Sequence, residues 1–385
     1  MKVEQNIARL QYLLSSYKMT IDDLLPIIGE GLKKKISKEN ILTNQIEIGY
    51  LKRIDKFFNK GIHYYLDPKS PEISQDASIF FRKQKFDIDL NIGAKKIVNQ
   101  FEEFKISLSA IAKLADIRID RSLPIYKVLD SPRQIAQEIR TLLNPTFISD
   151  KKDFLKSIIS KLAEQNILVF EFVETWNKKD KANIDGFFLN PNVIVLKRQQ
   201  TSFRREIFTL IHELGHYLLN EEEVEQIDYQ SLARANLNKT EKWCNDFAYY
   251  FLIGDSIQEM ESINIANSSN DYQFELIRKI SNDTHLSQIA LFTRLLFQKK
   301  MSQTDYNFVK ADLEEQYRKR DHELKKQREL DKENGLSAGG STPKPINSPL
   351  LISTIQTAFY EGVINEHEVC KRLNIKPDKL ETVLQ

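Results

Sequence analysis

The 385-residue chain lacks the features that define several protein classes. Its only cysteines are Cys244 and Cys370, so it can form neither a disulfide framework nor a zinc site built on cysteines. No apolar run approaches the length of a membrane-spanning helix, and the N-terminus lacks the apolar segment of a signal peptide. We therefore expect a cytoplasmic protein of a reducing compartment, with no membrane partner.

An excess of charge of one sign is also missing. The 56 Lys and Arg residues are nearly balanced by 54 Asp and Glu residues, which leaves a net charge of +2. This balance excludes a uniformly basic surface for nucleic acid, so any contact with DNA requires a local patch. The lysine-rich stretch at residues 31–40 is one candidate, although lysine runs more often form a solvated face.

The hydrophobic pattern predicts an α+β protein that is mostly helical. Short β-rich runs at residues 166–174 and 184–198 precede an amphipathic helix at 202–220, and we expect a small β-sheet to pack on that helix. The rest of the chain has helical spacing, apart from a linker rich in Gly and Pro. We predict a helical N-terminal region at residues 1–70, a helical connecting region at 71–160 and a mixed core at 161–300. A charged helix at 301–334, the linker at 335–349 and a small helical C-terminal segment at 350–385 follow.

The predicted helix at 202–220 contains the main chemical motif of the chain, His-Glu-Leu-Gly-His, which matches HExxH. Residues i and i+4 of a helix lie on one face, so His212 and His216 can direct both imidazoles at one metal ion. Glu213 lies beside this pair and can reach a water on the ion without being a ligand. The helix also carries an apolar stripe that would face a core: Phe203, Ile207, Ile211, Leu214 and Leu218.

A catalytic zinc site needs a third protein ligand, which should come from another element. His285, His322 and His367 are candidates by residue type. Glu241 is a better candidate, because it opens a second predicted helix 25 residues after His216. A connection of that length allows the second helix to turn back and lie across the first.

These motifs resemble the ImmA/IrrE family of metallopeptidases. The likeness is carried by FTLIHELGHYLL at residues 208–219 and by the downstream pattern ExxxNxFAxxxL at residues 241–252. Asp-Gly-Phe at residues 185–187, with the apolar strand after it, resembles the strand pair that precedes the active-site helix in the family. The resemblance covers about residues 160–255 and implies a minimal core of the zincin or gluzincin type.

The resemblance also implies the roles of individual residues. His212, His216 and Glu241 would be the metal ligands and Glu213 the general base, with Zn²⁺ as the cofactor or Mn²⁺ as a second choice. The implied reaction is hydrolysis of a peptide bond by a metallo-endopeptidase. Tyr249 and Tyr250 are candidate donors to the oxyanion that forms in such a reaction, although each is also a natural packing residue.

The flanking regions suggest a regulatory role and an alternative to it. The N-terminal region resembles the Xre-like helix-turn-helix part of longer family members, in a degenerate form. The resemblance implies limited cleavage of a partner protein such as a helix-turn-helix transcriptional repressor. The alternative is a regulator of the antitoxin kind that binds a cognate toxin, or binds DNA through residues 1–60, and whose metal site is structural or vestigial. A purely structural helical protein would require the HExxH match to be accidental.

Overall fold

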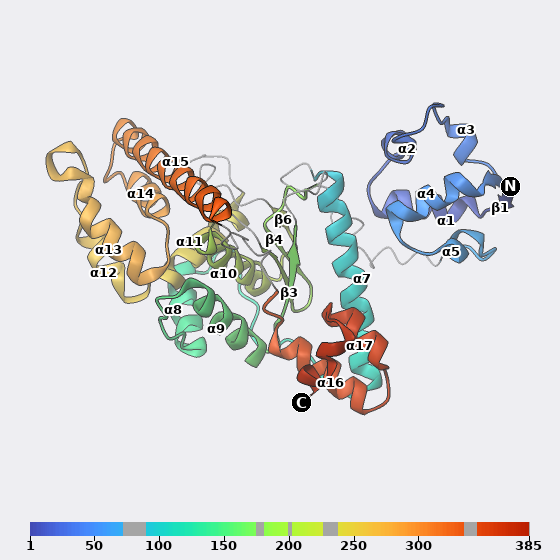
Figure 1. The fold of residues 1–385 in the computed structure, drawn as a ribbon. Coiled ribbons are helices and arrows are strands. Elements are labelled where there is room, and N and C mark those ends of the chain that lie inside the picture. The colour runs from blue at the N-terminus through green and yellow to red at the C-terminus, as the bar shows by residue number, and fades with distance from the viewer. Residues whose placement is uncertain (72–89, 175–180, 199–201, 226–237, 335–344, 385) are drawn as a thin grey trace. The chain divides into compact units, whose positions relative to one another are not determined.

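The computed structural model confirms an α+β fold that is mostly helical (Figure 1). The predicted linker at 335–349 lies largely outside the part of the chain that the structure describes, as does the beginning of the predicted connecting region at 71–160. None of the helices among the described residues is both long and apolar enough to cross a membrane. The structure describes residues 1–71, 90–174, 181–198, 202–225, 238–334 and 345–384.

The chain divides into two compact units. One consists of Met1–Ser107 with Asp180–Asn183, and the other of Leu108–Lys179 with Ile184–Gln385. The HExxH motif belongs to the second unit. The finer division into six segments remains a prediction from the sequence.

The first unit contains the helical N-terminal region, which has its own apolar core. Thr20 caps α2 and forms a reciprocal capping box with Asp23. α4 ends at Asn59, which adopts the left-handed conformation that commonly stops a helix. The sequence did not predict that β1 pairs antiparallel with β2. The elements are β1 (Lys2–Glu4), α1 (Ile7–Ser16), α2 (Ile21–Gly29), α3 (Lys38–Ile41), β2 (Gln45–Glu47), α4 (Ile48–Phe58) and α5 (Ile62–Leu66).

The second unit is built around a four-stranded sheet of order β3-β5-β4-β6. β3 (Leu168–Val173) runs parallel to β5 (Val193–Arg198), and β4 (Gly186–Leu189) runs antiparallel to β5. These three strands match the two β-rich runs read from the sequence. β6 (Val224–Glu225) pairs with the other side of β4 and was not predicted.

Within the second unit α9, α10 and α16 contact the sheet, and α10 contacts β4, β5, α9 and α11. α10 and α11 are the two helices that the sequence predicts around residues 202–220 and from near residue 240. α7 (Ile92–Leu114) begins in the first unit and ends in the second. The other helices of the second unit are α8 (Pro132–Leu143), α9 (Lys151–Glu164), α10 (Phe203–Leu219), α11 (Lys239–Ile253), α12 (Ile257–Ser262), α13 (Phe274–Thr284), α14 (Gln288–Phe297), α15 (Gln303–Glu333), α16 (Pro349–Tyr360), α17 (Glu366–Leu373) and α18 (Leu380–Leu384).

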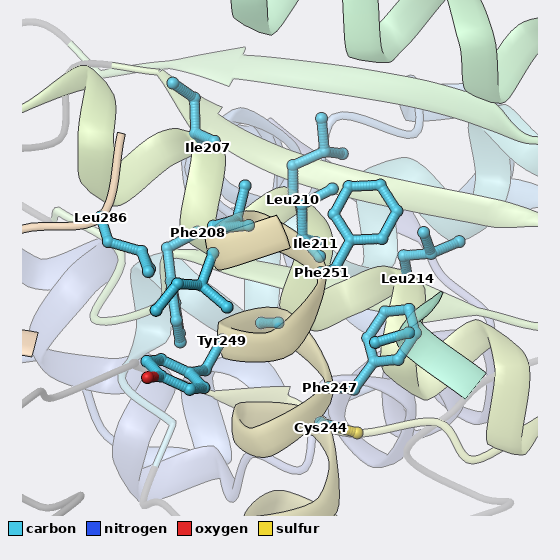
Figure 2. Packing of buried hydrophobic residues seen from close by; sticks show 14 of the residues in the cluster. Ile207, Phe208, Leu210, Ile211, Leu214, Cys244, Phe247, Tyr249, Phe251 and Leu286 are labelled. Atoms are coloured by element: carbon cyan, nitrogen blue, oxygen red, sulfur yellow. The ribbon is translucent and has the colours of Figure 1, made fainter. Parts of the chain in front are cut away.

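The contact between α10 and α11 is apolar and tightly packed. Leu210, Ile211 and Leu214 of α10 belong to one buried cluster with Phe247 and Phe251 of α11, and Figure 2 shows these side chains together. Aromatic and branched side chains of this size exclude water from the crossing. The crossing therefore holds the HExxH helix and the Glu241 helix in a fixed relation to each other.

Gly215 allows the two helices to approach closely. A Cβ atom at this position would lie 3.1 Å from Cys244 Sγ and 3.2 Å from Cys244 Cα. The backbone cannot move aside as a flexible side chain can. We predict that Gly215→Ala destabilises the second unit by about 1–2 kcal/mol, because overpacking outweighs the gain in helix propensity.

Thermal unfolding of the two glycine variants tests this prediction. Gly49→Ala is the matched control, since Gly49 is also helical but a Cβ there meets nothing within 4 Å. Gly49→Ala should leave stability unchanged or raise it slightly. A melting temperature for Gly215→Ala at or above that of the wild type would show that the crossing is looser than described.

Candidate metal centre

The HExxH residues lie in the C-terminal half of α10. Ser202 caps the start of the helix through a bond from the Arg205 backbone N–H, and Asn220 ends it in the left-handed conformation. These caps make the intervening residues one continuous helix, so that His212 and His216 project from the same face. Both histidines and Glu213 are at most 1% exposed.

α11 brings Glu241 to the two histidines. Asn238 caps α11 and accepts from the Glu241 backbone N–H at 2.8 Å, so Glu241 lies in the first helical turn. Its carboxylate oxygens lie 3.3 Å from His212 Nε2 and 3.1 Å from His216 Nε2. The two Nε2 atoms are 3.1 Å apart. The structure thus brings together the three residues that the sequence selected as ligands.

The geometry of this group fits a small divalent cation. In a tetrahedral site with bonds of about 2.1 Å, ligand atoms lie about 3.4 Å apart, close to the separations found here. Among the described residues, His212, His216 and Glu241 are the one group of three metal-ligating side chains with such convergent atoms. Two imidazoles and one carboxylate are a donor set that catalytic zinc sites use. A bound cation would also compensate the buried carboxylate.

Burial is the main cause of a shift in the pKa of Glu213. Desolvation raises the pKa of its carboxyl to about 8, against the lowering effect of His216, while Glu241 and Asp185 add to the rise. Its Oε2 atom is buried with no hydrogen-bond partner among the described residues. A carboxyl group whose pKa lies near neutrality can both accept and release a proton under ordinary conditions.

The surroundings of the two histidines shift their pKa values in opposite directions. Desolvation lowers the pKa of His212, despite the opposing effect of Glu241. Burial also acts to lower the pKa of His216, but the neighbouring Cys244 and Glu241 outweigh it and raise that pKa above the usual range. A metal ligand must be the neutral imidazole. Metal binding should therefore displace a proton from the pair.

Strand β4 contacts the HExxH helix at the position of Glu213. A Cβ atom on Gly186 would lie 2.8 Å from Thr209 Cγ2 and 3.1 Å from Glu213 Cγ, so only glycine fits without a shift. The preceding residue, Asp185, forms an ion pair of 2.5 Å with Arg205 in the first turn of α10. The Asp-Gly pair read from the sequence therefore fixes the strand beside the proposed base.

The other candidate third ligands lie elsewhere. His285 stacks on Phe147 at 4.9 Å between ring centroids, and its Nε2 lies 2.7 Å from the carbonyl oxygen of Ile148. His322 on α15 and His367 on α17 are exposed. None of these three histidines belongs to the convergent group.

The two tyrosines proposed as oxyanion donors contact Arg294 of α14. The Tyr250 hydroxyl accepts from this guanidinium at 2.6 Å, and the guanidinium also lies over the Tyr249 ring at 4.7 Å. Tyr249 is a buried member of the cluster in Figure 2. Neither tyrosine belongs to the convergent group, and the donor role remains a prediction.

Two residues of α11, Asn245 and Cys244, lie beside the ligands, and neither of them received a ligand or catalytic role from the sequence. The Oδ1 atom of Asn245 lies 3.1 Å from Nδ1 of His212, and Cys244 packs against Gly215 beside His216. The i, i+4 spacing of Glu241 and Asn245 was the available signal for Asn245, since it places both residues on the same face of the helix. No sequence signal identifies Cys244, because its position depends on the angle at which the helices cross.

The fold and site define a helical α+β domain in which two histidines of a HExxH motif and a glutamate form a group that could hold a metal ion. Residues 163–260 match the family model Peptidase_M78, described as the IrrE N-terminal-like domain. This match confirms the resemblance seen in the sequence, and the matched segment contains His212, Glu213, His216 and Glu241. No match to the chain was found among curated proteins or among solved structures.

Proposed function

We propose that this chain is a zinc-dependent endopeptidase that makes limited, regulatory cuts in a partner protein. The observation that carries the proposal is the buried convergence of His212, His216 and Glu241, with Glu213 next to them on the same helix. The match of residues 163–260 to a peptidase family model supports the reaction class. Zinc is the proposed ion because two imidazoles suit it better than Mn²⁺, which prefers oxygen ligands.

The residues at the site suggest a division of roles. His212, His216 and Glu241 would hold the ion, which when bound supplies a Lewis acid that acidifies water and polarises a peptide carbonyl. Glu213 would accept a proton from the attacking water and return it to the leaving amine. Its raised pKa suits both halves of this transfer. The close contact with Gly186 would limit the positions that its carboxylate can take.

The partner that we propose is a helix-turn-helix transcriptional repressor or a cognate toxin or antitoxin. The test is to incubate the zinc-loaded full chain with such proteins encoded beside its gene, and to identify fragments by mass spectrometry. We expect one cut, or a few, in one partner, and no cut after treatment with a chelator. If the loaded chain degrades unrelated unfolded proteins equally fast, the regulatory part of the proposal is wrong.

The alternative function, DNA or toxin binding with a structural or vestigial metal site, has weaker support. A helix-turn-helix protein places its recognition helix in the major groove, but α3, which follows α2, has only four residues. The exposed lysines near it are paired in part, since Lys38 forms an ion pair with Asp22. An intact Glu213 beside the ligand group also favours an enzyme.

A further inference from the structure

We propose that Asn245 is a positioning residue of the metal centre, which holds His212 so that its Nε2 atom faces the metal. The inference rests on the proposed function, because it assumes that His212, His216 and Glu241 bind a metal ion. It assigns a role to a residue that supplies no ligand atom. The supporting contact is the one between Asn245 Oδ1 and His212 Nδ1, at 3.1 Å.

The geometry gives His212 two distinct ring nitrogens. Nε2 points at Glu241 and at Nε2 of His216, whereas Nδ1 points at Asn245. In a neutral imidazole one nitrogen carries the hydrogen and the other carries the lone pair. An oxygen beside Nδ1 selects the tautomer with hydrogen on Nδ1, which leaves the lone pair on Nε2 for the metal.

The position of Asn245 on α11 couples this contact to the third ligand. Asn245 follows Glu241 by four residues, so both side chains leave the same face of the helix. The apolar crossing of α10 and α11 then fixes the acceptor and the carboxylate together against α10. One rigid helix therefore supplies both a ligand and the orientation of another ligand.

The neighbouring acid, Asp246, contacts α14 rather than the histidines. Its carboxylate forms an ion pair of 2.5 Å with Arg294 of α14. The acceptor beside His212 is therefore a neutral amide rather than a carboxylate. Because a carboxylate in that place would make the imidazole a stronger donor to the metal, Asn245→Asp should bind zinc at least as tightly as the wild type.

The test measures the affinity of the full chain for Zn²⁺ by competition with a chromophoric chelator, together with the melting temperature of the metal-free protein. Asn245→Ala should weaken zinc binding by about 10–100-fold, the usual cost of removing such an acceptor. Asn245→Asp should restore the wild-type affinity or exceed it. Asp246→Asn is the matched control, which should lower the melting temperature and leave the zinc affinity unchanged.

The outcomes separate this inference from the proposed function. Wild-type affinity in Asn245→Ala would overturn the positioning role while leaving the metal site intact. Equal losses in Asn245→Ala and Asn245→Asp would also overturn it, because the acceptor oxygen would not be what matters. If the wild-type chain binds no zinc, the proposed function itself fails, and the inference falls with it. Comparable melting temperatures among the Asn245 variants would show that any loss of affinity is not a loss of fold.

Discussion

Replacing Glu213 by glutamine should abolish peptide hydrolysis and leave the metal and the fold in place. Glutamine keeps the size of the side chain but cannot accept a proton from water, and loss of a general base typically costs about 10²–10⁴-fold in rate. The metal-free variant should melt no lower than the wild type, since burial already disfavours the ionised carboxylate and raises its pKa. The measurement is the rate of partner cleavage at matched zinc content.

Glu221→Gln is the control for this substitution. Glu221 lies just beyond the end of α10 and is exposed, so its variant should cleave at the wild-type rate. Persistent cleavage by Glu213→Gln would show that another group accepts the proton. Loss of zinc in the same variant would indicate that Glu213 is itself a ligand.

Removal of either histidine should eliminate the bound metal altogether. His212→Ala or His216→Ala leaves two protein ligands in a site that needs three, and no other His, Cys, Asp or Glu among the described residues forms a group of three with the remaining pair. We expect zinc content to fall from about one ion per chain to near zero after dialysis, as measured by elemental analysis. Cleavage should be lost in parallel.

A histidine outside the site supplies the control for these two variants. His367 is exposed on α17, so His367→Ala should retain the full zinc content. A stoichiometric ion in purified His216→Ala would show that the ligand set is wrong. Glu241→Ala extends the test to the third ligand, and unchanged zinc affinity in that variant would require a different third ligand.

The sequence predicted the parts of this site that depend on local spacing. His212 and His216 lie on one face because any helix places residues i and i+4 there, and Glu213 is next to them for the same reason. The strands β3, β4 and β5 also lie within the two β-rich runs that the short-range pattern identifies. Local spacing alone could not select Glu241 as a ligand, because that choice assumed that a second helix turns back onto the first.

The sequence did not reveal features that depend on how elements meet. β6 has two residues, too few to show a period, and its pairing with β4 depends on the path of the chain after α10. The contact of Gly215 with Cys244 reflects the distance between two helix axes, which no local pattern encodes. Helical spacing places Asn245 on the same face of α11 as Glu241. Its contact with His212 could not be predicted without the angle at which α10 and α11 cross.

X-ray absorption at the zinc edge of the loaded full chain tests the central claim most directly. The account predicts about one zinc per chain with a first shell of nitrogen and oxygen at about 2.0–2.1 Å, including two imidazoles. A sulfur atom at about 2.3 Å would contradict it, because that distance would place the ion on the nearby Cys244 thiolate rather than on His212, His216 and Glu241. Failure to load any zinc would contradict it as well.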